Sequence, residues 1–237
     1  MSKIHLIMPA ILAAVVSIQQ VPYDEQRVGT ATYYQADGNG NCMFDALPEP
    51  QYVAALNTED YNNPVINGQS YDNATMCGAY ALVTGRKGSI TVKIVDRCDG
   101  GLCTANHLDL STEAFAEIDD LDAGYVSINW QLVSVPLDGP VQFRYKDGSS
   151  QWWTGIQLLN HRNPVASVEL LRDSAWEVVP RTQYNYFIAD NGFGAGCPIL
   201  RVTDVFGNQL IETAKVCLDG DIVEQLEWTG LGQFPRP

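Results

Sequence analysis

The sequence predicts a mostly-β protein built from two domains. The stretch from Tyr125 to Leu132 alternates apolar and polar residues strictly, which is the period of a half-buried strand. From Val141 onward, short apolar segments recur at regular spacing with no helical period, which is typical of a small β-sandwich. The chain has 237 residues, enough to bury two modest cores.

The N-terminal segment, residues 1–17, has the features of a secretory signal peptide. Lys3 supplies a positive start, Ile4 to Val16 form a short apolar run, and Ser17 ends a suitable cleavage site. The run is shorter than a helix that spans a bilayer. We therefore expect a secreted, extracellular protein with no membrane anchor. The alternative is a buried N-terminal helix.

The first domain, residues 23–134, is predicted to hold four strands and one helix. The helix begins at Ser111, a suitable N-cap, and Phe115 and Ile118 follow at helical spacing. Turns rich in Gly and Asn separate the strands. The strands are 29–34, 80–84, 89–96 and 125–132, and the turns are 37–41, 61–73 and 85–88.

Residues 135–140 form a short linker that two prolines stiffen. We therefore expect the two domains to lie in a near-fixed relation. The second domain, residues 141–237, is predicted to be the sandwich. Its strands are expected at 141–145, 151–159, 165–171, 176–180, 184–188, 199–204 and 209–213.

Trp152 and Trp153 stand side by side within one of these predicted strands. Adjacent residues of a regular strand face opposite sides, so both rings can be exposed only if the strand is bulged or twisted. The alternative places one Trp in the core and the other on the surface.

The chain is strongly acidic, with 28 Asp and Glu against 14 Lys and Arg and a net charge of −14. Such a surface argues against nucleic acids, anionic membranes and anionic polysaccharides as main partners. It suits a neutral ligand, and we expect a monomer that needs no cofactor.

Six cysteines, an even number, fit an oxidising compartment. Four lie in the first half and two in the second, so we expect them to pair within each half. A zinc site that uses His107 is the rival, but no Cys-x-x-Cys pair supports it, and we expect no metal. The cysteines are Cys42, Cys77, Cys98, Cys103, Cys197 and Cys217.

Two carboxylates, Asp96 and Asp109, flank a Gly-rich loop. The first ends a predicted strand and the second directly precedes the predicted helix, so we expect them to share one neighbourhood. Paired carboxylates of this kind perform acid–base chemistry in carbohydrate-active proteins. The alternative is that one caps a turn and the other caps the helix.

The motifs Val-Asp-Arg-Cys at 95–98 and Leu-Asp-Leu-Ser at 108–111 resemble those of the six-stranded double-psi β-barrel domain that expansins, barwin-like proteins and family 45 endoglucanases share. The resemblance makes Asp109 the counterpart of the glycosidase general acid. It places Gln35, within Thr30-Ala-Thr-Tyr-Tyr-Gln35, where the endoglucanases carry their base. Because a neutral amide cannot accept the proton of water, the resemblance implies an acid without a base.

The second half resembles the C-terminal domain of bacterial expansins, an immunoglobulin-like β-sandwich. The motifs on which the resemblance rests are Ser-Ser-Gln-Trp-Trp at 149–153, Asn-His-x-x-Pro-Val at 160–165 and Tyr-Asn-x-Phe at 184–187. It implies that Trp152, Trp153 and Tyr184 form a planar row that binds cellulose, with Lys146 beside it. Flat aromatic faces suit the apolar faces of glucose rings.

The resemblance further implies a groove in the first domain lined by Thr32, Tyr33, Tyr34, Asp96 and Asp109. A pairing of Cys42 with Cys77 would match plant expansins, and Cys98 with Cys103 would close a small loop. Bacterial relatives carry an aromatic residue where this chain has Cys98, so Tyr33, Tyr34 or Tyr61 would have to supply that surface.

We thus expect a secreted expansin that binds cellulose, and also xyloglucan or other neutral β-glucans. It would loosen plant-type walls by disrupting non-covalent glucan contacts rather than by cleavage, and so would not be an enzyme. One alternative is a weak endoglucanase or lytic transglycosylase that uses Asp109 as general acid. A second alternative is a barwin-like polysaccharide-binding module.

Overall fold

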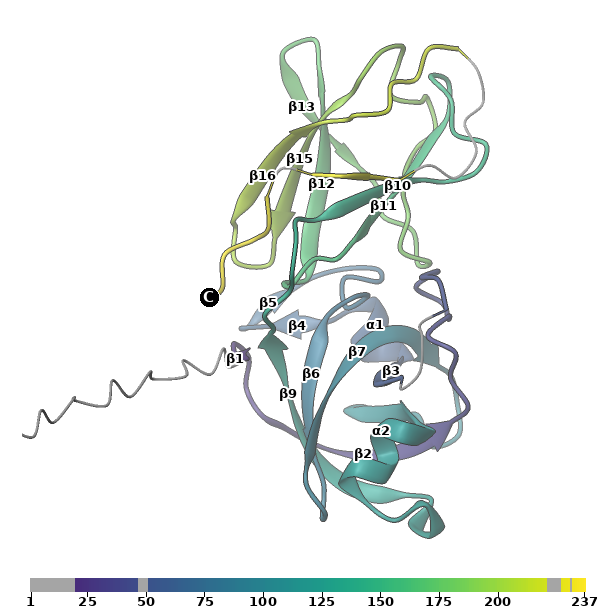
Figure 1. Ribbon diagram of the computed structural model, residues 1–237, viewed down its shortest axis with the longest axis vertical. Helices are drawn as coiled ribbons and strands as arrows, with labels where there is room; N and C mark the ends of the chain where they lie inside the picture. The colour runs from purple at the N-terminus through teal and green to yellow at the C-terminus, as the bar shows by residue number, and fades with distance from the viewer. Residues whose placement is uncertain (1–19, 47–50, 221–226, 231) are drawn as a thin grey trace, which may run out of the picture.

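The computed structural model describes residues 20–46, 51–220, 227–230 and 232–237, so the predicted signal peptide lies outside the described residues. Two β-units lie one above the other along the long axis of the molecule (Figure 1). Neither of the short helices in the described ranges has the length and apolar character that crossing a bilayer requires.

The first unit is a closed barrel of six strands. The strands follow one another in the order β9-β2-β8-β3-β7-β6, and β6 pairs back onto β9. Two of the pairs, β2 with β8 and β3 with β7, are parallel. The bounds are β2 Arg27–Tyr34, β3 Val53–Asn57, β6 Tyr80–Thr84, β7 Ser89–Cys98, β8 His107–Ser111 and β9 Val126–Ser134, and β1 Val21–Pro22 adds to the edge of β9.

Strand β9 has the faces that the alternation predicts. Ile128, Trp130 and Leu132 are buried in the barrel core, whereas Ser127 and Asn129 are exposed. The hairpin of β6 and β7 also lies where the pattern predicted it.

Two barrel strands differ from the prediction. All five residues of β3 are buried, so the strand shows no alternation and the sequence pattern did not reveal it. Residues 107–111 were expected to lead directly into a helix, but they form β8, which pairs with β2 and β3. Asp109 therefore lies within a strand and not at a helix start.

The predicted helix is present as α2, Thr112–Ile118, and covers one end of the barrel beside β2 (Figure 1). The side chain of Ser111 accepts a hydrogen bond from the backbone N–H of Ala114, which confirms the N-cap. Phe115 and Ile118 are fully buried. The smaller elements are α1 Thr58–Asn62, β4 Val65–Ile66, β5 Gln69–Ser70 and a 3₁₀ turn at Leu121–Ala123.

The second unit is a sandwich of two antiparallel four-stranded sheets, ordered β14-β11-β10-β17 and β13-β12-β15-β16. Phe143 and Tyr145 pack against Trp228 in its core. The fold class, a double-psi barrel followed by a β-sandwich, is as predicted. The bounds are β10 Gln142–Tyr145, β11 Thr154–Leu159, β12 Val165–Arg172, β13 Ala175–Val179, β14 Phe187–Ala189, β15 Ile199–Asp204, β16 Gln209–Thr213 and β17 Glu227–Thr229.

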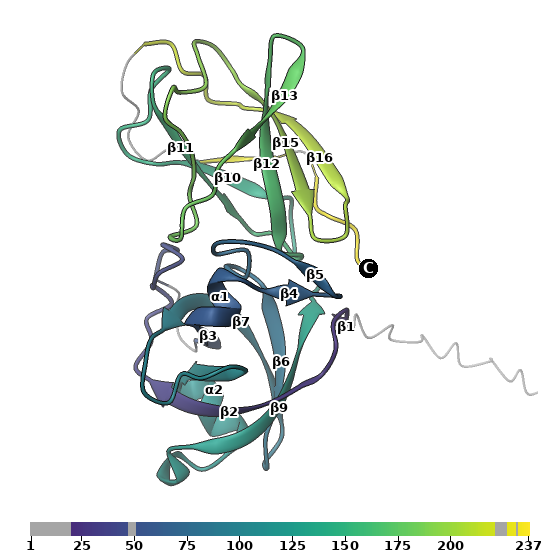
Figure 2. The same cartoon turned by 180° about the vertical axis from the view of Figure 1, so that it is seen from behind.

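The two units also lie one above the other in the view from behind (Figure 2). Side chains of one unit contact the other. The buried ring of His161 lies so close to Gly78 that a Cβ on that glycine would approach its Cε1 to 2.6 Å. Arg181 donates to Thr75 Oγ1 at 2.8 Å, and Tyr71 donates to the carbonyl of Val205 at 3.0 Å. This contact supports the near-fixed relation expected from the linker.

Candidate functional site

Asp96 and Asp109 lie on either side of a single alanine. In the barrel wall Ala55 of β3 pairs with Asp96 of β7 on one side and with Asp109 of β8 on the other. Neighbouring strands are about 4.8 Å apart, so the two acidic Cα atoms are separated by roughly 10 Å. Residues paired across strands point to the same face, and the fold therefore brings the two carboxylates to one surface.

Asp109 is held by a threonine from the neighbouring strand. Thr32 pairs with Asp109 in the parallel β2–β8 register, and its hydroxyl donates to Asp109 Oδ1 at 2.7 Å. The same hydroxyl lies 2.9 Å from Nε2 of His107, whose Nδ1 lies 2.9 Å from the hydroxyl of Thr30. A chain of hydrogen bonds thus runs from Thr30 through His107 and Thr32 to Asp109.

The positions of the hydroxyl and imidazole protons determine which group donates in each of these hydrogen bonds. Thr32 has one hydroxyl proton and gives it to the carboxylate, so it must accept from His107, which places the imidazole proton on Nε2. The ring of His107 is fully buried. Burial lowers the pKa of His107, and the opposing attraction of Asp109 does not reverse this. The histidine is therefore a neutral support that orients Thr32.

Asp96 is bound differently. Its Oδ1 accepts the backbone N–H groups of Asn41 at 2.6 Å and of Arg97 at 2.8 Å. The carboxylate therefore anchors the loop that leads to Asn41, which is the turn-capping role left open by the sequence. Its second oxygen makes no hydrogen bond among the residues that the structure describes.

Tyr34 lies near both carboxylates. Its phenol makes no hydrogen bond within the described residues. Burial raises the pKa of Tyr34 far above its ordinary value, and the nearby charges of Asp96, Asp109 and Asp37 raise it further. The hydroxyl is thus a neutral group held among three acids. Tyr33 is 36% exposed and packs on Phe115.

The position expected to hold a base carries Gln35, which is exposed and lines a cavity of about 220 Å³. Glu113, at the start of α2, lines the same cavity. Glu113 is not among the site residues predicted from the sequence.

Two alternatives lose support in the structure. Tyr61 is completely buried, so it cannot supply an exposed stacking surface in place of Cys98. Cys98 and Cys103 lie close enough to His107 for a metal cluster, but they form a disulfide and have no thiolates to offer. The other disulfides are Cys42–Cys77 and Cys197–Cys217.

The paired tryptophans lie at a turn, which resolves the question of how both could be accessible. Trp152 belongs to a turn, Trp153 forms an isolated bridge with Ser150, and β11 begins only at Thr154. The hydroxyl of Ser149 accepts from the N–H of Gly155 at 3.1 Å, which helps to fix the turn. Trp152 is 71% exposed and Trp153 is half-buried.

Tyr184 was expected at the start of a strand but lies in the turn before β14. It is 37% exposed, and its ring centroid is 6.1 Å from that of Tyr186. The ammonium of Lys146 lies 4.9 Å above the ring of Tyr186. Lys146 and Trp153 both approach Gly155, since a Cβ there would meet both side chains within 3.5 Å.

The predicted groove, called the groove below, consists of Thr32, Tyr33, Tyr34, Asp96 and Asp109. The predicted aromatic row, called the aromatic row below, consists of Trp152, Trp153 and Tyr184. The sequence did not reveal the residues that join them. Asn41 donates through its side chain to the carbonyl of Gln183 at 2.8 Å, and the hydroxyl of Tyr61 donates to the same carbonyl at 2.9 Å.

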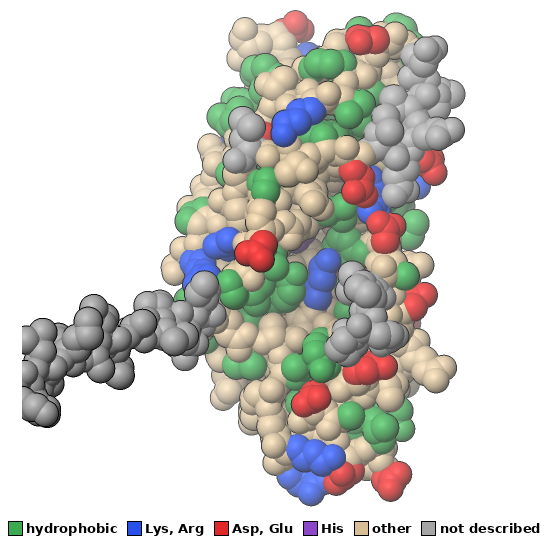
Figure 3. All heavy atoms as spheres, in the orientation of Figure 1, with side chains coloured by type: hydrophobic (Ala, Val, Ile, Leu, Met, Phe, Trp, Pro, Cys, Tyr) green, Lys and Arg blue, Asp and Glu red, His purple; other side chains and the backbone are tan. Residues whose placement is uncertain are grey.

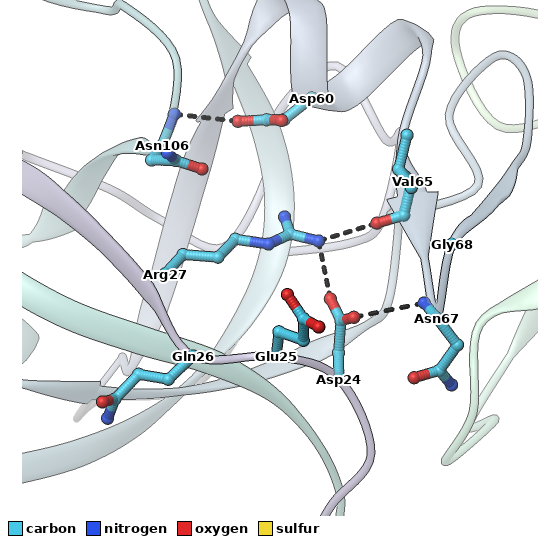
Figure 4. Close-up of a pocket in the computed structure, with 9 residues that line it drawn as sticks. All are labelled: Asp24, Glu25, Gln26, Arg27, Asp60, Val65, Asn67, Gly68 and Asn106. Carbon is cyan, nitrogen blue, oxygen red and sulfur yellow. Dashed lines mark hydrogen bonds and ion pairs between the residues drawn. The ribbon is translucent and has the colours of Figure 1, made fainter.

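Another pocket lies on the barrel, beside the start of β2, and has a volume of about 590 Å³ (Figure 4). Arg27 projects into it and donates to Asp24 at 2.6 Å and to the carbonyl of Val65 at 2.8 Å. Its guanidinium stacks on the buried ring of Trp130. None of the groove residues lines this pocket.

Comparison with known proteins gives concordant results. A family model described as "Lytic transglycolase" matches residues 53–130. The chain is 32% identical to Expansin-YoaJ of Bacillus subtilis, over 90% of this chain and 89% of that protein. It is 28% identical to Expansin-like protein 5 of Dictyostelium discoideum, over 94% of each.

Among solved structures, an apo crystal structure of the Clavibacter michiganensis expansin is similar, with a TM-score of 0.75 and 31% identity. The match covers 89% of this chain and 99% of that one. A mutant of the same protein, crystallised in complex with cellohexaose, matches equally well. The similarity thus extends over both the barrel and the sandwich.

Proposed function

The chain belongs to the bacterial expansins, and on that premise we propose that it is a secreted protein that binds cellulose and loosens glucan networks without cleaving them. The proposal assigns binding to the aromatic row and loosening to the groove. Its two parts rest on different features of the molecule.

The observation that carries the binding role is the exposure of Trp152. Among the described aromatic side chains with large exposure it is the most accessible, at 71%. A ring held in water by a fixed turn gains apolar contact when it covers the C–H face of a glucose unit. The cellohexaose complex of the similar expansin supports the choice of a β-glucan as ligand.

The groove supports a non-hydrolytic role. Asp109 is fixed by Thr32 and can accept a hydrogen bond from a sugar hydroxyl. Hydrolysis with inversion needs a second carboxylate that activates water across the sugar. The expected position holds the amide of Gln35, and Asp96 already accepts two backbone N–H groups.

A cellulose pull-down run beside a reducing-sugar assay tests this proposal. We expect the full protein to be depleted from solution by crystalline cellulose while no sugar is released. Release of sugar at a catalytic rate would contradict the non-hydrolytic role, and absence of binding would contradict the assignment to cellulose.

One observation favours a second candidate function. The barrel matches a family model described by lytic transglycosylase activity, which needs only a single acid. In that case Asp109 would be the general acid, and the missing base would be irrelevant. Incubation with peptidoglycan distinguishes the two, because a transglycosylase releases anhydro-sugar ends and an expansin releases none.

A further inference from the structure

A pocket of about 250 Å³ opens where the barrel meets the sandwich. Asn39, Met43 and Asp45 line it from the barrel loop, and Lys146, Asp147 and Tyr186 line it from the sandwich. None of these barrel residues belongs to the groove, and none of the six belongs to the aromatic row. The pocket is therefore a separate feature that both domains build.

The pocket adjoins residues that neighbour both the groove and the aromatic row. On the barrel side, Asn39 precedes Gly40, whose Cα lies against the side chain of Asp96, since a Cβ there would meet Asp96 Cγ at 2.5 Å. On the sandwich side, Lys146 lies against Gly155 together with Trp153, and Tyr186 neighbours Tyr184. A glucan chain that contacts both sites would therefore pass close to this pocket.

The charges of the pocket balance. Arg144 is almost completely buried and forms ion pairs with Asp45 and Glu227. Among the lining residues the cations Arg144 and Lys146 face the anions Asp45 and Asp147, which gives a net charge of zero (2 − 2 = 0). A neutral ligand suits such a lining better than an ion does.

The remaining groups suit a sugar. The ammonium of Lys146 lies over the Tyr186 ring and has no ion pair in the described part of the chain. Asp147 is exposed without an ion pair among the described residues. The amide oxygen of Asn39 accepts from the N–H of Gly40, which leaves its NH₂ group to donate. Met43, 44% exposed, and Tyr186 add apolar wall. Convergent donors and acceptors beside an apolar wall are typical of small-molecule sites.

We propose that this pocket receives a neutral monosaccharide branch of a substituted β-glucan whose backbone lies along the groove and the aromatic row. The inference rests on the proposed function, because it needs the backbone to contact both sites. A branch that enters the pocket adds hydrogen bonds that an unbranched chain lacks, so the protein would prefer branched glucans.

The test compares two oligosaccharides of equal backbone length by titration calorimetry with the full protein. The probes are cellohexaose and a xyloglucan oligosaccharide with a six-glucose backbone and neutral branches. We expect the branched probe to bind about fivefold more tightly, the effect of one additional net hydrogen bond. In the double variant Asn39→Ala, Asp147→Ala the ratio should fall to about one while cellohexaose affinity stays unchanged.

Both substituted side chains are exposed, so the variant should keep its thermal midpoint. The control is Asn129→Ala, an exposed asparagine on β9 outside the pocket, which should retain the preference. Equal affinities in the wild type, or a preference that survives the double variant, would overturn the inference but not the proposed function. Failure to bind cellohexaose at all would overturn both. Tighter binding of a glucuronic acid-substituted probe would show that Lys146 selects an anion and would contradict the neutral branch.

Discussion

The side-chain amide of Asn41 donates to the backbone carbonyl of Gln183 at 2.8 Å, and this bond joins the groove to the aromatic row. The backbone N–H of Asn41 binds Asp96 of the groove, whereas Gln183 immediately precedes Tyr184 of the row. Asn41 thus contacts the groove in one domain and the residue that precedes the aromatic row's Tyr184 in the other.

Loss of this bond should weaken the coupling between the two sites. In Asn41→Ala we expect binding to cellulose to remain within about twofold of the wild type, since the aromatic row is untouched. Wall loosening should fall because Tyr61 then holds the carbonyl of Gln183 without Asn41, and the two sites are held in line less firmly. The measurement is cellulose pull-down beside creep of plant wall strips.

The matched control is Tyr71→Phe, which removes another hydrogen bond between the domains, from Tyr71 to the carbonyl of Val205. It should cost about 1 kcal/mol of stability, as Asn41→Ala should, but leave loosening intact. Equal loss of loosening in both variants would show that the effect is one of stability alone.

The aromatic row can be tested by single substitutions. Trp152→Ala should weaken cellulose binding by roughly 1.5–3 kcal/mol, the apolar burial of one large side chain. Its thermal midpoint should not change, because the ring is mostly exposed. Trp176→Ala serves as control: Trp176 lies on β13 of the same domain, beneath Arg201, and is not part of the row. Weaker binding in both variants, or in neither, would contradict the assignment.

The acidic surface predicts how polysaccharide binding depends on salt concentration. Acidic side chains outnumber basic ones along the right-hand edge of the face drawn in Figure 3, over both domains. Stacking on a neutral glucan involves little charge pairing, so binding to crystalline cellulose should be indifferent to salt. Binding to anionic pectin should be weak and increase with salt as repulsion is screened. Strong pectin binding that salt abolishes would indicate a basic face that this account lacks.

The buried His161 gives a pH dependence. Burial, with weaker contributions from Lys93 and Arg181, lowers its pKa to about 3. The unfolded chain, with an ordinary histidine, binds a proton more readily than the folded protein does, so stability is full above about pH 6.5 and falls as the pH drops toward 3. The slope approaches about 1.4 kcal/mol per pH unit for this residue. His161→Gln, measured by denaturant unfolding at pH 7, 5.5 and 4, should show a shallower decline than the wild type. A decline of unchanged slope would exclude His161 as its source.

The question of hydrolysis has a specific test as well. If the protein released sugar, the base would be one of the carboxylates near the groove, and Glu113 beside Gln35 and Asp37 beside Tyr34 are the candidates. We expect wild type, Glu113→Gln and Asp37→Asn to be equally inactive in a reducing-sugar assay. Activity in the wild type that one of these substitutions removes would identify the base and make the protein an enzyme.

How far the sequence could predict the structure depends on how local each signal is. The alternation of β9 and the Ser111 cap are local patterns, and both are present as predicted. Strand β3 was not predicted because both of its faces are buried, so its residues do not alternate. Strand β8 was not predicted because its pairing with β2 joins residues 77 apart in the sequence, such as Thr32 and Asp109. Only the topology shows that Ala55 separates the two acids.

The same reasoning applies to the site. The sequence indicated Asp96, Asp109 and the aromatic row as the residues of interest, because the motifs that contain them resemble those of a known family. It could not show that Asn41 reaches Gln183, since the two are 142 residues apart and Asn41 stands in a stretch that reads only as a turn. Contacts that depend on how two domains meet cannot be predicted from a local sequence pattern.

We propose that Asp109 acts in loosening without hydrolysis, and the creep of plant wall strips treated with Asp109→Asn is the measurement that tests this role. The substitution is nearly isosteric and keeps an acceptor for the Thr32 hydroxyl, so stability should change by less than about 1–2 kcal/mol. Asp122→Asn, which changes an exposed aspartate in the 3₁₀ turn outside the groove, is the control. We predict creep with the wild type and the control, none with Asp109→Asn, and no sugar released by any of the three. Full creep with Asp109→Asn, or sugar release by the wild type that this substitution abolishes, would contradict the account.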